Sequence, residues 1–179
     1  MSETGLTRPT PSDYSPHFAR YVSLVPEDQV LPVLAAQGDE VRRALAAVKE
    51  DAAGFRYADG KWSIREVVGH LADTERLMAY RALCFARGEK AGLPGFDEDE
   101  YVRQAGFDAI PLPELVAEFR AARDASLPLF RHLARDAWAR GGLANGRPST
   151  VRSVAYVMAG HVRHHLNVLR ERYHVGAPL

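Results

Sequence analysis

The residues best suited to chemistry in this sequence are its histidines, which are unevenly placed. Three of the seven, His161, His164 and His165, lie within five positions. On an α-helix, residues four apart are separated by about 40° around the axis and about 6 Å along it. His161 and His165 could therefore bind one metal ion, as helical histidine pairs do in zinc proteases. The same spacing also fits two partly buried histidines that are hydrogen-bonded to their neighbours, so the pair alone does not distinguish a metal site from two structural histidines.

The residues around this pair indicate that it faces the core. Val154, Met158 and Val168 fall on the same helical stripe as His161 and His165. His164 is rotated by about 100° from His165. We therefore expect His164 to lie outside the ligand set, packing or bonding beside it.

His70 is the candidate third ligand, on a separate predicted helix whose apolar face it shares. Three buried imidazoles without partners would be costly, because each has one donor and one acceptor to satisfy. A metal ion removes that cost, and an imidazole set suits zinc, nickel or iron. We predict that His70, His161 and His165 bind one divalent transition metal.

Other candidate residues have weaker signals. Asp73 follows His70 by about one turn and could orient an imidazole or relay a proton; it could equally pair with Arg76 or Arg65. The acidic run Asp97–Glu100 could supply a carboxylate ligand, although charge runs are usually solvated.

Two residues near the histidines are expected to be structural. Trp62 precedes a helix and is typical of a core plug, and Gly160 is expected to let another segment approach the last helix closely. His132 is expected at the surface, and His17 carries no spacing signal.

The elements that position these residues are predicted to be helical. Apolar periodicity and caps indicate helices over about 27–48, with Pro32 in the first turn, over 63–87, from about Pro113 onward and from 149 or 150 to 173. A short helix is expected over 97–105 within a long crossover. Asn145-Gly146 predicts a tight turn, but no strand pattern is visible. The fold class is therefore all-α, a four-helix bundle with a long crossover between its second and third helices.

Composition limits the remaining possibilities. The 179 residues, 46% of them hydrophobic, suit one domain, expected over 17–175 after a flexible, proline-rich arm over 1–16. Lys plus Arg and Asp plus Glu both number 23, so there is no bulk charge to bind nucleic acid or an anionic membrane. The single Cys84 excludes an intrachain disulfide and a cysteine zinc site, and fits a reducing cytoplasm. No apolar run approaches the ~20 residues of a membrane span.

Three segments of the chain together resemble one family. Residues 60–71, 93–99 and 159–166 are similar, in order, to motifs of the DinB superfamily, and most like its YfiT-type branch of metal-dependent hydrolases. The resemblance extends from about Phe18 to Tyr173. It implies a four-helix bundle with a divalent metal on three histidines, which fall on His70, His161 and His165. It also implies zinc or nickel as the metal, a homodimer and, from related branches, a low-molecular-weight thiol as a possible cosubstrate.

The predicted ligand set favours catalysis over a structural role. Structural zinc sites are closed by four protein ligands, whereas three neutral ligands leave a position open for water or substrate. The sequence therefore predicts a metal-dependent hydrolase or thiol-dependent transferase acting on a small molecule. The alternative is a non-catalytic, metal-bearing stress-response protein that binds a ligand without converting it. DNA binding is the weakest hypothesis, because the chain is neutral and has no basic helix.

Overall fold

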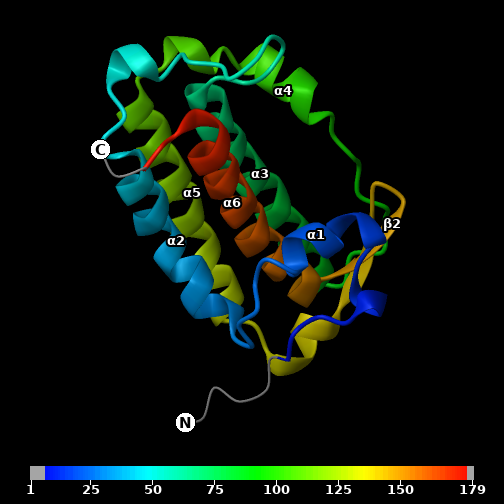
Figure 1. Ribbon diagram of the computed structural model, residues 1–179. Helices are drawn as coiled ribbons and strands as arrows, with labels where there is room; N and C mark the ends of the chain where they lie inside the picture. Colours follow the sequence, from blue (N-terminus) through cyan, green and yellow to red (C-terminus); the bar gives the residue numbers. More distant parts are fainter. Residues whose placement is uncertain (1–6, 177–179) are drawn as a thin grey trace.

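The computed structural model describes residues 7–176, and its main feature is a bundle of four long helices (Figure 1). These are α2 (Val30–Leu45), α3 (Ile64–Ala86), α5 (Leu112–Arg131) and α6 (Val151–Tyr173). Two shorter helices are α1 (Ala19–Val22) and α4 (Glu98–Ala105). Single 3₁₀ turns are η1 (Pro11–Asp13), η2 (Pro16–Phe18), η3 (Glu50–Ala52), η4 (Phe107–Ala109) and η5 (Arg135–Ala139). The predicted all-α four-helix bundle is confirmed.

Helices α3 and α5 start at the same end of the bundle. The carboxylate of Glu50, in η3, accepts hydrogen bonds from the Leu112 N–H at the start of α5, at 3.2 Å to each oxygen, and pairs with Arg65 in the first turn of α3 at 2.5 Å. Because the long helices α3 and α5 run parallel, the segment 87–111 between them has to return along the whole bundle. Figure 1 shows this return, which includes α4. This is the predicted long crossover.

The two helices that carry the candidate site begin at well-defined caps. The Ser63 hydroxyl accepts from the Glu66 N–H at 3.0 Å, while the Glu66 carboxylate accepts from the Ser63 N–H at 2.7 Å. At the start of α6 the Thr150 hydroxyl accepts from the Ser153 N–H at 3.2 Å. Each such cap stabilises a helix by about 1 kcal/mol. The capping box predicted at Ser63 is confirmed, and the caps fix where α3 and α6 begin.

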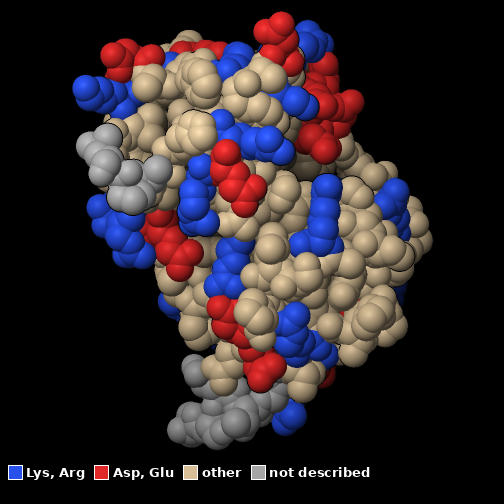
Figure 2. Space-filling view, viewed as in Figure 1, with Lys and Arg blue, Asp and Glu red and all other residues tan. Residues whose placement is uncertain are grey.

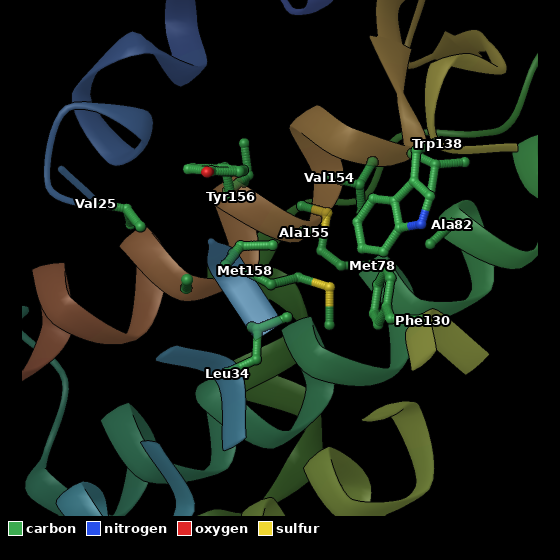
Figure 3. Packing of buried hydrophobic residues seen from close by; sticks show 14 of the residues in the cluster. Val25, Leu34, Met78, Ala82, Phe130, Trp138, Val154, Ala155, Tyr156 and Met158 are labelled. Carbon is green, nitrogen blue, oxygen red and sulfur yellow. The ribbon is translucent and has the colours of Figure 1, made fainter. Parts of the chain in front are cut away.

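The apolar core has two clusters, one toward each end of the bundle. In the first, Trp138 packs against Phe130 with ring centroids 5.8 Å apart, close to Ala82 and Val154 (Figure 3). The second centres on the fully buried Leu115, Phe119, Val68 and Leu169. Along α6, Met158 belongs to the first cluster and Val162 to the second. The candidate ligand His161 therefore lies where the two clusters meet.

A small β-hairpin, which the sequence did not predict, precedes α6. Strands β1 (Gly141–Ala144) and β2 (Arg147–Thr150) pair antiparallel around the predicted Asn145-Gly146 turn, whose residues have φ angles of 52° and 67°. The strands are four residues long and contain two glycines and a proline, so no alternation marks them. Leu93 bonds to the hairpin through Leu143 O and Asn145 N, both at 2.9 Å. The hairpin therefore anchors the crossover.

Residues 7–16, the described part of the segment expected to be a flexible arm, contact the hairpin, and the flexibility of this segment stays a prediction. Tyr14 pairs with Ser149 of β2, and Ser15 is buried. Thr10 and Asp13 form a capping box around η1. The prolines and hydroxyl residues thus form turns that pack on the hairpin, whereas residues 1–6 lie outside the described part.

Charges of both signs are interspersed on the face seen in Figure 2, and acidic atoms gather over α4. This distribution agrees with the zero net charge. No helix within residues 7–176 combines the length and apolar character needed to cross a membrane.

Gly160 allows α1 to rest directly on α6. A Cβ at this position would overlap the backbone carbonyl of Tyr21. We expect Gly160→Ala to lower the free energy of unfolding by about 1–3 kcal/mol, because α1 has to move and the overlap outweighs the higher helix propensity of alanine. Denaturant unfolding followed by circular dichroism measures the change.

Gly38→Ala on α2 is the matched control. There the added Cβ meets only the side chain of Arg120, which is half exposed and can move. We expect this variant to be as stable as the parent or more stable. Equal stability of Gly160→Ala and the parent would contradict the close approach.

Candidate metal centre

The structure brings the three predicted ligands together. His70 comes from α3, and His161 and His165 come from successive turns of α6. The Nε2 atom of His161 lies 3.0 Å from Nε2 of His70 and 3.1 Å from Nε2 of His165. The three side chains are 6%, 7% and 9% exposed, and their nearest ligand atoms all lie within 4.8 Å of one another.

This donor set fits a divalent transition metal. Nitrogen ligands at ~2.0–2.1 Å from a tetrahedral ion lie about 3.3 Å from each other, close to the observed separations. Without an ion, Nε2 of His161 has either one proton or one lone pair, so it can form a good hydrogen bond with only one of its two neighbours. Within residues 7–176 the buried Nδ1 of His165 also has no hydrogen-bond partner. A shared cation satisfies the converging nitrogens where hydrogen bonding cannot.

The environment keeps these imidazoles neutral and thus able to act as ligands. Burial and, to a smaller extent, the nearby His164 lower the pKa of His70 to about 4. Burial is also the main reason that the pKa values of His161 and His165 lie well below their usual range, with charge on the other histidines adding to the effect. At neutral pH, lone pairs are available for a metal.

The lowered pKa of His70 predicts an acid-sensitive metal-free protein. An unfolded imidazole has a pKa of about 6.5, so between about 6.5 and about 4 the unfolded chain binds a proton that folded His70 does not. The free energy of unfolding therefore falls as the pH falls through this window, by about 2 kcal/mol at pH 5 from His70 alone. Urea unfolding of chelator-treated protein at pH 7.5 and pH 5 measures this loss.

His70→Gln should reduce the pH dependence by the share of His70, since the lowered pKa values of His161 and His165 still contribute, whereas substitution of the exposed His132 by Gln should leave it unchanged. A metal-free protein that is equally stable at both pH values would contradict the burial of neutral imidazoles.

The histidines line a cleft of about 370 Å³. Its walls come from five parts of the chain: the α1 region, Trp62, α3, the crossover with the hairpin, and α6. The lining residues are His17, Phe18, Arg20, Tyr21, Trp62, His70, Thr74, Met78, Arg81, Phe96, Glu98, Ala144, Asn145, Arg147, Val157, His161, His164 and His165. A cleft of this size suits a small molecule rather than a macromolecule.

Aromatic rings cover the histidine cluster. The ring of Trp62 lies 4.7 Å from that of His70 and is stacked near His165, with centroids 6.4 Å apart and planes 17° apart. The Tyr21 ring meets His161 edge-on at 5.4 Å. Trp62 packs against the second core cluster, as the prediction of a core plug implies, but it is only partly buried and also lines the cleft.

The other predicted site residues lie apart from the ligand cluster. Asp73 pairs with Arg76 at 3.4 Å and does not line the cleft. Within the described chain, no carboxylate or thiol joins the three histidines, although Glu98 from the acidic run lines the cleft. His164 lines the cleft beside Tyr21 without being a member of the ligand cluster, in agreement with its rotation on α6.

Sequence reasoning gave no role in the site to the arginines and His17 of the cleft. Arg81 follows His70 by eleven residues, which returns it to within about 20° of the same helix face. That phasing could have identified it. Arg20, Arg147 and His17 come from segments without regular periodicity, so no spacing could have placed them.

Four helices with a parallel central pair and three converging imidazoles define a helical bundle with a candidate metal centre. A family model described as the DinB superfamily matches residues 34–169. The chain belongs to the DinB superfamily.

Individual relatives agree with this assignment. A protein of Geobacillus thermodenitrificans (strain NG80-2) named "Putative metal-dependent hydrolase" is 28% identical over 74 residues, which are 41% of this chain and 42% of that protein. The matched part is thus less than half of the relative. YfiT from Bacillus subtilis, described as a probable metal-dependent hydrolase with an unusual four-helix bundle topology, has a TM-score of 0.73 at 19% identity, over 96% of each chain.

A second solved structure shares the fold. The mycothiol-dependent maleylpyruvate isomerase has a TM-score of 0.66 at 16% identity, over 82% of this chain and 61% of the isomerase. At such identities these likenesses concern the fold.

Proposed function

We propose that this protein is a metal-dependent hydrolase of small molecules, with His70, His161 and His165 holding a zinc or nickel ion. The observation that carries the proposal is the convergence of three buried imidazoles on the wall of an open cleft, with no carboxylate or thiol among the described residues to complete the set. Three-ligand sites are the catalytic pattern, since structural zinc has four. The membership in the DinB superfamily and the hydrolase descriptions of two relatives support it.

Each side of the site has a role in this proposal. A bound divalent metal would supply Lewis-acid polarisation of a substrate carbonyl or of water. The rings of Trp62 and Tyr21 exclude bulk water from the histidines. The Tyr21 hydroxyl oxygen accepts a hydrogen bond from Arg20 at 2.8 Å, which leaves the phenol proton free to donate to a substrate oxygen.

An activity screen tests the hydrolase proposal. Purified protein is stripped with a chelator, reloaded with zinc or with nickel, and assayed on panels of esters, amides and phosphoesters. We expect hydrolysis of at least one class that disappears with chelator, returns with metal and is absent from His161→Ala. Hydrolysis that persists in the stripped protein and in His161→Ala would contradict the proposal, and metal binding without turnover would favour the non-catalytic alternative.

Thiol transfer is the second candidate function. It is favoured by the shared fold of the mycothiol-dependent isomerase, and the same cleft would have to hold the thiol. Adding low-molecular-weight thiols to the same screen separates the two: turnover that requires the thiol indicates thiol-dependent chemistry, and turnover at the same rate without thiol indicates hydrolysis. A homodimer and a cytoplasmic location stay predictions, which sedimentation and cell fractionation would test.

A further inference from the structure

The cleft has an excess of positive charge that the fold does not neutralise. Arg20, Arg81 and Arg147 line it, and Glu98 is the one acidic residue among its described lining. None of the three arginines forms an ion pair within the described chain, whereas nine of the arginines outside the cleft do.

Arg81 is the most informative of the three, because it is buried. Arg81 is only 7% exposed, and its Nη2 donates to the Pro94 carbonyl at 2.9 Å. The guanidinium also lies 5.7 Å from the centre of the Phe96 ring. These neutral contacts orient the group without compensating its charge, and a buried charge lacking a counter-ion is costly. A guanidinium held in this way retains N–H groups able to bind an anion in a planar, two-pronged manner.

The position of Arg81 relates the charge to the histidines. It lies three turns after His70 on almost the same face of α3, and helical side chains lean toward the N-terminal end of their helix. The guanidinium therefore extends back along the cleft toward the ligand cluster. Arg20 and Arg147 approach from the α1 region and the hairpin. Within residues 7–176 the side chain of Arg20 bonds only Tyr21, and that of Arg147 bonds only Ser15, at 3.4 Å.

We propose that the cleft binds its small molecule through an oxyanion, a carboxylate or a phosphate, which Arg81 holds with help from Arg20 and Arg147. This inference rests on the proposed function and deepens it, because it names the class of substrate that would bind beside the metal. The binding of the anion by the arginines does not depend on a metal.

Direct binding tests the inference on chelator-treated protein. Succinate and inorganic phosphate serve as the two oxyanion probes, and succinamide is the neutral match for succinate. The thermal midpoint is recorded against probe concentration at constant ionic strength, and the side-chain N–H resonances of arginine are followed by NMR. We expect one or both anions to raise the midpoint and shift the Arg81 resonance, and succinamide to do neither; which anion binds better distinguishes carboxylate from phosphate.

Variants distinguish binding of the anion by the cleft arginines from a general effect of the positive charge of the protein. Arg81→Gln should weaken anion binding at least about tenfold, and Arg81→Lys should restore only part of it because the fork is lost. Joint substitution of Arg20 and Arg147 by Gln should weaken binding too, and it serves if Arg81→Gln fails to fold. The exposed Arg131, outside the cleft, is the control, and Arg131→Gln should bind as the parent does.

Two results would overturn the inference: no binding of either anion to the parent, or equal binding by the parent, Arg81→Gln and the double variant. Failure of the proposed function is distinguishable from both. A protein that binds no zinc but binds succinate through Arg81 would contradict the metal centre while supporting the anion site.

Discussion

Replacing His161 with alanine is expected to lower metal affinity by more than about 100-fold. Removing a residue that only hydrogen-bonds to a metal ligand costs up to about 100-fold, and removing the ligand itself should cost more. His161 is the central ligand, because its Nε2 lies within 3.1 Å of Nε2 in both other histidines. Its loss leaves two imidazoles from different helices. Elemental analysis after desalting should show stoichiometric metal in the parent and a substoichiometric amount in the variant.

Two other histidines serve as controls for this prediction. His132→Ala removes an exposed imidazole outside the cleft, and His164→Ala removes one that lines the cleft without joining the cluster. Both variants should retain the metal of the parent. Circular dichroism of the metal-free proteins checks that each variant folds. Full retention of metal by His161→Ala would mean that the ligand set is wrong.

Glu75→Ala is expected to lower the free energy of unfolding by about 3–5 kcal/mol, the cost of breaking a buried ion pair on one side. Arg123 donates to both carboxylate oxygens of Glu75 at 2.8 Å, and both side chains are almost fully buried. Arg123 also donates to Gln37 Oε1 at 2.8 Å, and Gln37 donates to the Ala159 carbonyl at 2.7 Å. The network therefore joins α2, α3, α5 and α6. It reaches α6 at Ala159, two residues before His161.

A surface pair gives the matched comparison. Glu27 and Arg163 are 2.6 Å apart, but their side chains are 41% and 26% exposed. Glu27→Ala should cost no more than about 1 kcal/mol. The combined variant Glu75→Leu with Arg123→Met should recover much of the loss, since neither charge is then left buried alone. If Glu75→Ala is no less stable than Glu27→Ala, the buried network does not hold the bundle together as described.

The sequence was most informative where local physics decides the outcome. A hydroxyl followed by Glu66 three residues later fixed the start of α3, because the cap bonds are made within one turn. Helical phase then separated His161 and His165 from His164, and the structure places them accordingly. The resemblance to the DinB superfamily is confirmed by the matching family model.

The sequence was least informative where tertiary contacts decide. Asp73 lies three residues from His70 and turns toward Arg76, whereas Thr74, four residues away, enters the cleft. The smaller rotation of four residues on a helix explains the difference. The hairpin strands exist only because the turn, the crossover and the N-terminal segment pair with one another. Such pairings leave no periodic pattern in the sequence.

X-ray absorption at the metal edge is the most direct test of the metal centre, using parent protein reloaded with zinc or nickel. For the parent, the account predicts backscattering from three histidine rings, with zinc–nitrogen distances of ~2.0–2.1 Å. For any metal still bound to the His161→Ala variant, it predicts backscattering from one ring fewer. A spectrum without imidazole backscattering, or one unchanged by His161→Ala, would contradict the three-histidine centre.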